Sequence, residues 1–244
     1  MTISTNPRPL VLVPGAGLGG WAFARITPAL RAAGHDVHPI TLTGTGDRAH
    51  LNGPHLDVSA WATDVVAHLE TEELADVVLV GHSFGGVVAT AVAERAAGRL
   101  ARLVYLEGVV PGDGDSAFSV GGAEFEQVIT ALVEAHDGWS LPWFTDEQLG
   151  TYYGDHALTA ADLRWIRRHV TAQPLATMRE AVALGDPAAA ALPRTYVRCA
   201  GTPGPPLVAP GTAGWDHAEL ATGHWPMITA PDATAALLAA VAAA

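Results

Sequence analysis

A glycine-rich turn in the first half of the chain constrains its fold more than any other segment. The apolar stretch Val77–Val80 predicts a buried parallel strand. Residues 81–85 then read Gly-His-Ser-Phe-Gly, which fits the pattern G-x-S-x-G, and Val87–Ala97 predicts a helix because it is rich in Ala and Val and contains no Gly or Pro. A serine between such a strand and helix sits in strained backbone with its hydroxyl exposed. We therefore interpret Ser83 as a nucleophile; the alternative is a glycine-rich turn with an incidental serine.

The glycines and the helix start of this turn have predicted roles of their own. A side chain at Gly81 or Gly85 would collide with the neighbouring strand and helix. The start of the following helix offers free backbone N–H groups and a partial positive charge to an oxyanion.

The composition limits the class of protein and its chemistry. A chain of 244 residues with 49% apolar and 16% charged residues is expected to form one globular domain. The net charge of −12 argues against a nucleic-acid partner or an anionic membrane. All 13 basic residues are Arg, so chemistry through a lysine Schiff base is excluded. The lone Cys199 lies in an apolar strand pattern and is expected to be a buried, inert thiol.

We predict no signal peptide and no membrane span at the two ends of the sequence. Met1–Pro9 is short and polar and does not fit a signal peptide. Ala233–Ala244 is too short for a membrane span and predicts a terminal helix that packs on the sheet. We expect a cytoplasmic protein that acts on a small molecule, with no nucleic-acid or membrane partner. The sequence leaves open whether it forms a homodimer.

Short apolar runs alternate with helical stretches over most of the chain, which predicts a parallel sheet with helices on both faces. Besides Val77–Val80, the predicted strands are Leu10–Val13, Val37–Leu42, Leu103–Leu106, Thr195–Ala200 and the neighbourhood of Glu219–Ala221. Besides Val87–Ala97, the predicted helices are Trp21–Ala33 and Val58–Glu73. Ligands of such sheets bind at the carboxyl ends of the strands. The residues that follow strands, and so converge on this edge, are Pro14, Ser83, Glu107, Gly201 and His224.

The stretch Pro111–Leu192 breaks the alternation, because it holds many aromatic residues among helical patterns. We predict an α/β core made of residues 1–110 and 193–244, with residues 111–192 inserted as a helical cap. A cap of this kind excludes water and shapes a substrate pocket.

A serine nucleophile needs a base near neutral pH. Of the eleven histidines, His224 alone lies between the last predicted strand and the terminal helix. Enzymes with a G-x-S-x-G turn carry serine, acid and histidine in that chain order, with the histidine in this loop, so we interpret His224 as the base. His82 lies within the turn, and we expect its side chain to point away from the nucleophile. No pair of histidines has metal-ligand spacing with a third ligand, so no metal and no cofactor is predicted.

Two backbone N–H groups are predicted to stabilise an oxyanion. One belongs to Phe84, which follows the nucleophile, and the second to Ala16, with Gly17 as the next choice. The same loop, Gly15–Gly20, also fits the dinucleotide pattern G-x-G-x-x-G. That interpretation requires an acidic residue after the second strand, and Ile40–Thr43 contains none.

The chain resembles the α/β-hydrolase superfamily along essentially its whole length. Within it, the chain is similar to the branch of plant methylesterases, hydroxynitrile lyases and bacterial salicylate-esterase-like proteins. The stretches that carry the resemblance are Leu12–Trp21, Thr41–Leu51, the G-x-S-x-G turn, Leu103–Ser116 and Gly223–Pro231. The resemblance implies the α/β-hydrolase fold and a cofactor-free serine enzyme that acts on a small ester, lactone, thioester or cyanohydrin-like molecule.

The chain departs from this family at two places. Pro14-Gly15 stands where the family usually has His-Gly, so a side chain is lost but the backbone donors remain. The loop after Thr195–Ala200, where the family carries its triad Asp, contains no carboxylate. Glu107, at the end of the strand after the nucleophile, is the predicted replacement, because some α/β-hydrolases place their acid there. Asp216 is the second candidate, on a loop closer to His224 in sequence.

Three functions compete at this point. The first is hydrolysis of a small hydrophobic ester, lactone or thioester through an acyl-enzyme on Ser83. The second is lyase or cyclase chemistry on a cyanohydrin-like or polyketide-like molecule, with Ser83 and His224 as acid and base. The lyases of this branch recruit a lysine, which the chain lacks. The third is a ligand-binding homologue without catalysis.

Overall fold

The computed structural model of the protein describes residues 7–154 and 156–244. It is built on a six-stranded sheet in the order β2-β1-β3-β4-β7-β8, in which every neighbouring pair is parallel. The strands are β1 (Leu10–Val13), β2 (Val37–Pro39), β3 (Val77–His82), β4 (Leu100–Leu106), β7 (Arg194–Cys199) and β8 (Trp215–Leu220). Every residue of β1 and β3 is buried, as expected of central strands covered on both faces. The predicted α/β-hydrolase fold is confirmed.

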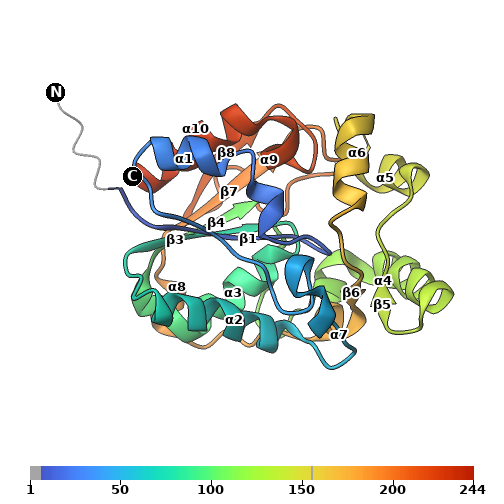
Figure 1. Ribbon diagram of the computed structural model, residues 1–244. Coiled ribbons are helices and arrows are strands. Elements are labelled where there is room, and N and C mark those ends of the chain that lie inside the picture. Colours follow the sequence, from blue (N-terminus) through green and yellow to red (C-terminus); the bar gives the residue numbers. More distant parts are fainter. Residues whose placement is uncertain (1–6, 155) are drawn as a thin grey trace.

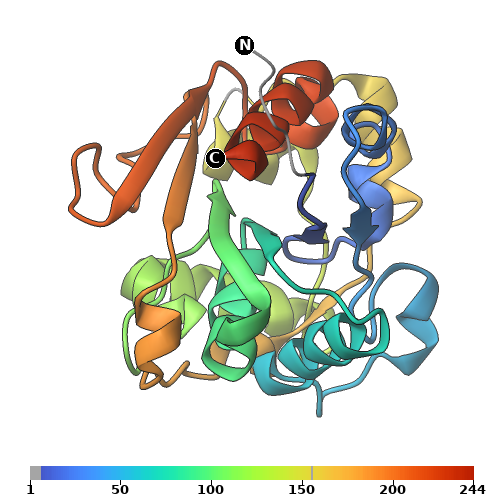
Figure 2. The same cartoon turned by 90° about the vertical axis from the view of Figure 1, so that its left-hand side faces the viewer.

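Helices cover both faces of this sheet, as Figures 1 and 2 show. One layer contains α1 (Thr27–Ala32), α9 (Pro226–Thr229) and α10 (Pro231–Ala243), and the other contains α2 (Val58–Thr71), α3 (Gly85–Ala96) and α8 (Pro187–Ala190). Three short 3-10 helices, η1 (Gly20–Phe23), η2 (Gly46–Leu51) and η3 (Ala97–Arg99), lie in the connections. The core between the layers contains large side chains that are almost fully buried, among them Trp61, Phe23 and Tyr196.

Most of the segment between β4 and β7 lies beyond the carboxyl ends of the strands, on the right in Figure 1. It contains α4 (Ala117–His136), β5 (Ser140–Leu141), α5 (Asp146–Tyr153), α6 (Ala160–Arg167), β6 (Gln173–Pro174) and α7 (Leu175–Arg179). Helices α4, α5 and α6 each begin with a capping box, at Ser116, Thr145 and Thr159, so the start of each is fixed by its own sequence.

Three predicted elements have different bounds in the structure. The helix expected over Trp21–Ala33 is divided into η1 and α1, because Pro28 fits the first turn of a helix and not its interior. β2 ends at Pro39, and one further bond to β1 follows it, from the Ile40 N–H to the Leu12 carbonyl at 2.9 Å. β8 begins at Trp215, so Asp216 lies in a strand and not on the expected loop.

Two expectations about the ends of the chain have different outcomes. The expectation that the N-terminus is not a signal peptide falls mostly on residues 1–6, which lie outside the described residues. The predicted terminal helix is α10. In the described parts of the chain, no helix combines the length and the apolar character that crossing a membrane requires.

Candidate active site

Ser83 occupies the turn between β3 and α3 with a left-handed backbone, φ 51°. The two glycines of the turn are required by close approach. A Cβ at Gly81 would lie 2.5 Å from the carbonyl oxygen of Gly85, and a Cβ at Gly85 would lie 2.6 Å from the carbonyl oxygen of Val13. Both distances are far below van der Waals contact, which is the collision that the sequence predicts for these positions.

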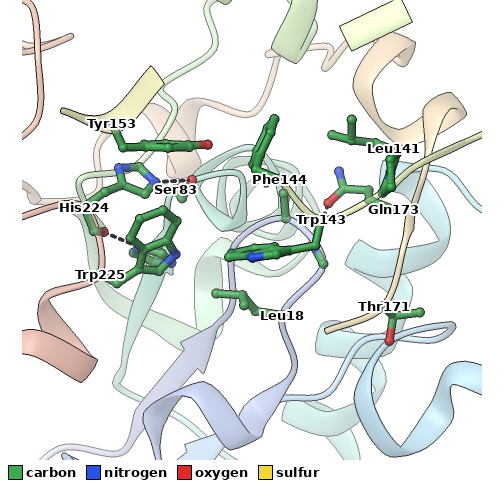
Figure 3. Close-up of a pocket in the computed structure, with 14 residues that line it drawn as sticks. Leu18, Ser83, Leu141, Trp143, Phe144, Tyr153, Thr171, Gln173, His224 and Trp225 are labelled. Carbon is green, nitrogen blue, oxygen red and sulfur yellow. Dashed lines mark hydrogen bonds between the residues drawn. The ribbon is translucent and has the colours of Figure 1, made fainter. Parts of the chain in front are cut away.

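His224 lies in the loop between β8 and α9 and is 7% exposed. Its Nε2 is 2.9 Å from Ser83 Oγ, within hydrogen-bond distance (Figure 3). Its loop is held by His82, whose Nε2 donates to the His224 carbonyl oxygen at 2.8 Å. The His82 ring packs 5.2 Å from the His224 ring, so it does not simply point away from the nucleophile, as the sequence suggested, but supports the predicted base.

The surroundings of both imidazoles favour their neutral form. Burial lowers the pKa of His82 to about 4. Burial, with smaller contributions from the charges of His82 and Arg198, also lowers the pKa of His224 well below its ordinary value. A neutral His224 at physiological pH is able to accept a proton from Ser83.

The loop after β1 leaves one backbone donor free and fixes the next. The Gly17 N–H donates to Gln173 Oε1 at 3.2 Å, and the Gly17 carbonyl accepts from the Thr171 N–H at 2.9 Å. In the described parts of the chain, the N–H groups of Ala16 and Phe84 have no acceptor, and both residues border the cavity that contains Ser83. The geometry therefore favours Ala16 over Gly17 as the second oxyanion donor.

Glu107 directly follows β4 and has a left-handed backbone like that of Ser83, with φ 45°. Its carboxylate accepts from Arg198 Nη1 at 2.5 Å and from the backbone N–H of Cys199. Burial raises the pKa of Glu107, although the Cys199 N–H and the Arg198 charge pull in the opposite direction. Cys199 itself is fully buried, as expected, and burial raises the pKa of its thiol.

The hydrogen bond that a Ser83–His224–Glu107 triad requires is absent from the described residues. His224 Nδ1 is buried and has no acceptor there. The Arg198 guanidinium also donates to the carbonyls of Thr202 and Gly204. It therefore links Glu107 to the loop after β7, which is the loop without a carboxylate. Glu107 therefore stays a prediction as the triad acid.

Asp216, the other candidate for the acid, lies at the opposite end of the sheet from Ser83 and His224. It lies at the amino end of β8, whereas His224 follows the carboxyl end. Its side chain is 68% exposed and pairs with Arg102 Nη1 at 2.5 Å. We therefore discard Asp216 as the acid.

Ser83 opens onto an apolar cavity of about 220 Å³ beneath α4. Its walls are made by core and cap residues, chiefly Phe84, Val109, Phe125, Ile129, Phe144 and Met178. An outer cavity of about 340 Å³ shares Phe125, Phe144 and Tyr153 with it. On the other side of Ser83, a recess of about 20 Å³ is bordered by Leu18, Trp143 and Trp225 (Figure 3). No cluster of three or more His, Cys, Asp or Glu side chains in residues 7–154 and 156–244 is placed to hold a metal ion.

Three residues around this site are not among those predicted from the sequence. Gln173 and Tyr153 come from the cap and Arg198 from β7. The aromatic content of the cap indicated pocket-lining residues in general, but not which ones. Arg198 carried a signal that was overlooked, because a charged residue within an otherwise apolar strand pattern calls for a partner.

Comparisons with known proteins found a family model, sequence relatives and solved structures that match this chain. The model of the alpha/beta hydrolase family matches residues 10–237. A carbendazim hydrolyzing esterase of Nocardioides sp. (strain SG-4G) is 34% identical over 246 residues, which cover 95% of this chain and 98% of the relative. Methyl jasmonate esterase 1 of Vitis vinifera is 32% identical over 110 residues, 43% of this chain and 41% of that protein. Among solved structures, an extracellular alpha/beta-hydrolase from a Paenibacillus species, similar to tobacco salicylic acid binding protein 2, superposes with a TM-score of 0.82 at 22% identity and covers 95% of this chain and 98% of its own.

Proposed function

We propose a specific reaction for this chain, which belongs to the alpha/beta hydrolase family and is a hydrolase of the esterase type. In this reaction the enzyme cleaves a small, apolar ester, lactone or thioester through an acyl-enzyme on Ser83. The observation that carries the proposal is the 2.9 Å contact between Ser83 Oγ and His224 Nε2, next to an apolar cavity.

The reaction consists of two steps with one proton carrier. Ser83 Oγ attacks the carbonyl carbon and gives its proton to His224 Nε2, while the N–H groups of Ala16 and Phe84 stabilise the oxyanion. The tetrahedral intermediate then breaks its bond to the leaving oxygen, which takes the proton from His224. In the second step His224 accepts a proton from water, the resulting hydroxide attacks the acyl-enzyme, and Ser83 recovers its proton as the acid departs.

The shape and charge of the cavity support a small, neutral substrate. Cavities that hold drug-sized ligands measure about 300–1,000 Å³, so about 220 Å³ suits a compact apolar group. The net charge of −12 disfavours anionic substrates. The name of the Nocardioides relative makes carbendazim a substrate to test.

Glu107 has an indirect place in this proposal. Its side chain is 6% exposed and that of Arg198 is 13% exposed, so the pair is largely removed from water. The Arg198 charge opposes protonation of His224. By neutralising Arg198, Glu107 limits this opposition, without a hydrogen bond to the imidazole.

One observation favours a second candidate. Among the described residues His224 Nδ1 has no acceptor, so the contact that a triad mechanism requires is not seen, and non-hydrolytic lyase or cyclase chemistry is the alternative. In that case Ser83 and His224 move protons on the substrate and no acyl-enzyme forms.

Hydrolysis of simple esters tests the proposal. Purified protein is given methyl and 4-nitrophenyl esters of short-chain acids, and carbendazim, with Ser83→Ala as the control. We expect turnover that falls at least ~10⁴-fold in Ser83→Ala. Turnover of no ester, or equal turnover by Ser83→Ala, would contradict it.

A further inference from the structure

Tyr153, the last residue of α5, joins the cap to the proposed base. Its ring centroid lies 4.6 Å from that of His224 and 4.8 Å from that of Trp225. It borders the small recess and both larger cavities, so it stands where they meet. In Figure 3 the ring lies over the imidazole, and its hydroxyl extends past the imidazole on the side of Ser83.

The Tyr153 hydroxyl has no hydrogen-bond partner among the described residues. Tyr153 is half-buried and borders the cavities, whereas the buried Tyr105 bonds through its hydroxyl to Thr90 Oγ1 at 2.8 Å. Burial raises the pKa of Tyr153 to about 12, so the phenol stays protonated at any working pH. An unused donor at the wall of a substrate cavity is available to a ligand.

The arrangement around Ser83 indicates which substrate atom receives this donor. The carbonyl oxygen of the substrate faces the N–H groups of Ala16 and Phe84. The leaving oxygen takes its proton from His224 Nε2, so it lies beside the imidazole that Tyr153 covers. We propose that Tyr153 is a further catalytic residue, whose hydroxyl donates a hydrogen bond to the leaving oxygen of the ester.

This assignment rests on the proposed function and narrows its substrate class. As the bond between the carbonyl carbon and the leaving oxygen breaks, negative charge develops on that oxygen, and a hydrogen-bond donor beside it stabilises this charge. A second donor matters most when that oxygen is strongly basic. Tyr153 therefore extends the substrate range of the enzyme from activated esters to alkyl esters. It donates a hydrogen bond only; the proton that leaves with the alcohol is the one that Ser83 gave to His224.

Two esters with the same acyl group and different leaving groups distinguish a hydrogen bond to the leaving oxygen from a packing role of Tyr153. The leaving oxygen of methyl butanoate is strongly basic and depends on proton and hydrogen-bond donors, whereas 4-nitrophenyl butanoate releases a phenolate that departs without help. We expect Tyr153→Phe to lower kcat/KM about 10- to 10²-fold for the methyl ester and less than ~3-fold for the nitrophenyl ester. Both esters form one acyl-enzyme, and kcat/KM reports the steps up to its formation.

Tyr152→Phe is the matched control. Tyr152 is 39% exposed and its ring contacts Phe144 at 5.6 Å, so we expect it to change neither rate constant more than ~2-fold. Tyr153→Phe keeps the ring and removes a hydroxyl that has no partner in residues 7–154 and 156–244, so its melting temperature should match that of the wild type.

Two outcomes would overturn the assignment: an equal fall for both esters in Tyr153→Phe, which indicates packing, or no fall for either. Failure of the proposed function looks different. In that case the wild type hydrolyses neither ester, or Ser83→Ala hydrolyses them as well as the wild type.

Discussion

The ends of the adjacent strands β3 and β4 use the same backbone device for different purposes. Ser83 and Glu107 both have a left-handed backbone, with φ of 51° and 45°, a conformation that costs a non-glycine residue about 1–3 kcal/mol. Ser83 presents its hydroxyl to His224 and an apolar cavity. Glu107 instead presents its carboxylate to Arg198 and the Cys199 N–H.

The comparison teaches that the same strained backbone at two strand ends can present side chains to very different surroundings. What the side chain meets decides its role: a neutral base and a cavity for Ser83, and a buried cation for Glu107. We therefore expect changes at Ser83 to affect rate and leave stability intact, whereas changes at Glu107 affect both.

The largest expected effect on stability in this comparison comes from Glu107→Gln. Breaking a buried ion pair leaves the Arg198 charge uncompensated, so we expect the free energy of unfolding to fall by about 3 kcal/mol. We expect kcat/KM to fall by about 10²-fold, because that charge then opposes the imidazolium. Denaturant unfolding and steady-state kinetics measure the two quantities.

The double variant Glu107→Gln/Arg198→Gln sharpens this prediction. Removing both charges should recover part of the stability and most of kcat/KM. A loss of about 10⁴-fold that the double variant does not recover would show that Glu107 acts directly as the triad acid. Asp216→Asn is the control, since it breaks the exposed pair with Arg102 and should cost less than about 1 kcal/mol.

The pH dependence of kcat/KM should show the low basicity of His224. The base works in its neutral form, and burial lowers the pKa of His224 well below 6.5. The rate should therefore persist as the pH falls through 6.5, and at pH ~5.5 it should exceed that of a histidine of ordinary pKa by about tenfold. The profile in Arg198→Gln should have its acid limb at higher pH. An acid limb centred near 6.5 in the wild type would contradict the account.

The smallest effect concerns the loop that carries Ala16. Gln173→Leu leaves the Gly17 N–H without its acceptor, so the loop loosens and we expect kcat/KM to fall about fivefold with KM little changed. Asn52→Leu removes a nearby hydrogen bond to the Ala172 carbonyl without touching this loop. Equal effects of the two variants would indicate general loosening of the cap.

The parts of the site that depend on local sequence could be predicted. Strand, turn and helix around Ser83 follow from apolar runs and two glycines that close packing requires. The place of His224 follows from the order of the elements, because parallel strands bring their carboxyl ends to one edge. The bounds of α1 were predicted wrongly. The apolar pattern of residues 21–33 favoured one continuous helix, although Pro28 indicated a helix start.

The parts that depend on contacts between distant segments could not be predicted. Glu107 contacts Arg198 and not His224 because of how β4 and β7 pair. The register of that pairing cannot be predicted from the sequence of either strand alone. Asp216 was misplaced because β8 is half exposed and lacks the apolar pattern of a buried strand. Tyr153 was one aromatic residue among many in the cap, and only the packing of α5 against the core brings it to His224.

Covalent labelling of the serine tests the central claim most directly. The protein is treated with a fluorophosphonate, and its intact mass is measured beside that of Ser83→Ala and Glu107→Gln. The account predicts one adduct in the wild type, none in Ser83→Ala, and slower but complete labelling in Glu107→Gln. A folded wild-type protein that takes up no adduct would show that Ser83 is not activated, and would direct attention to acid–base chemistry without an acyl-enzyme.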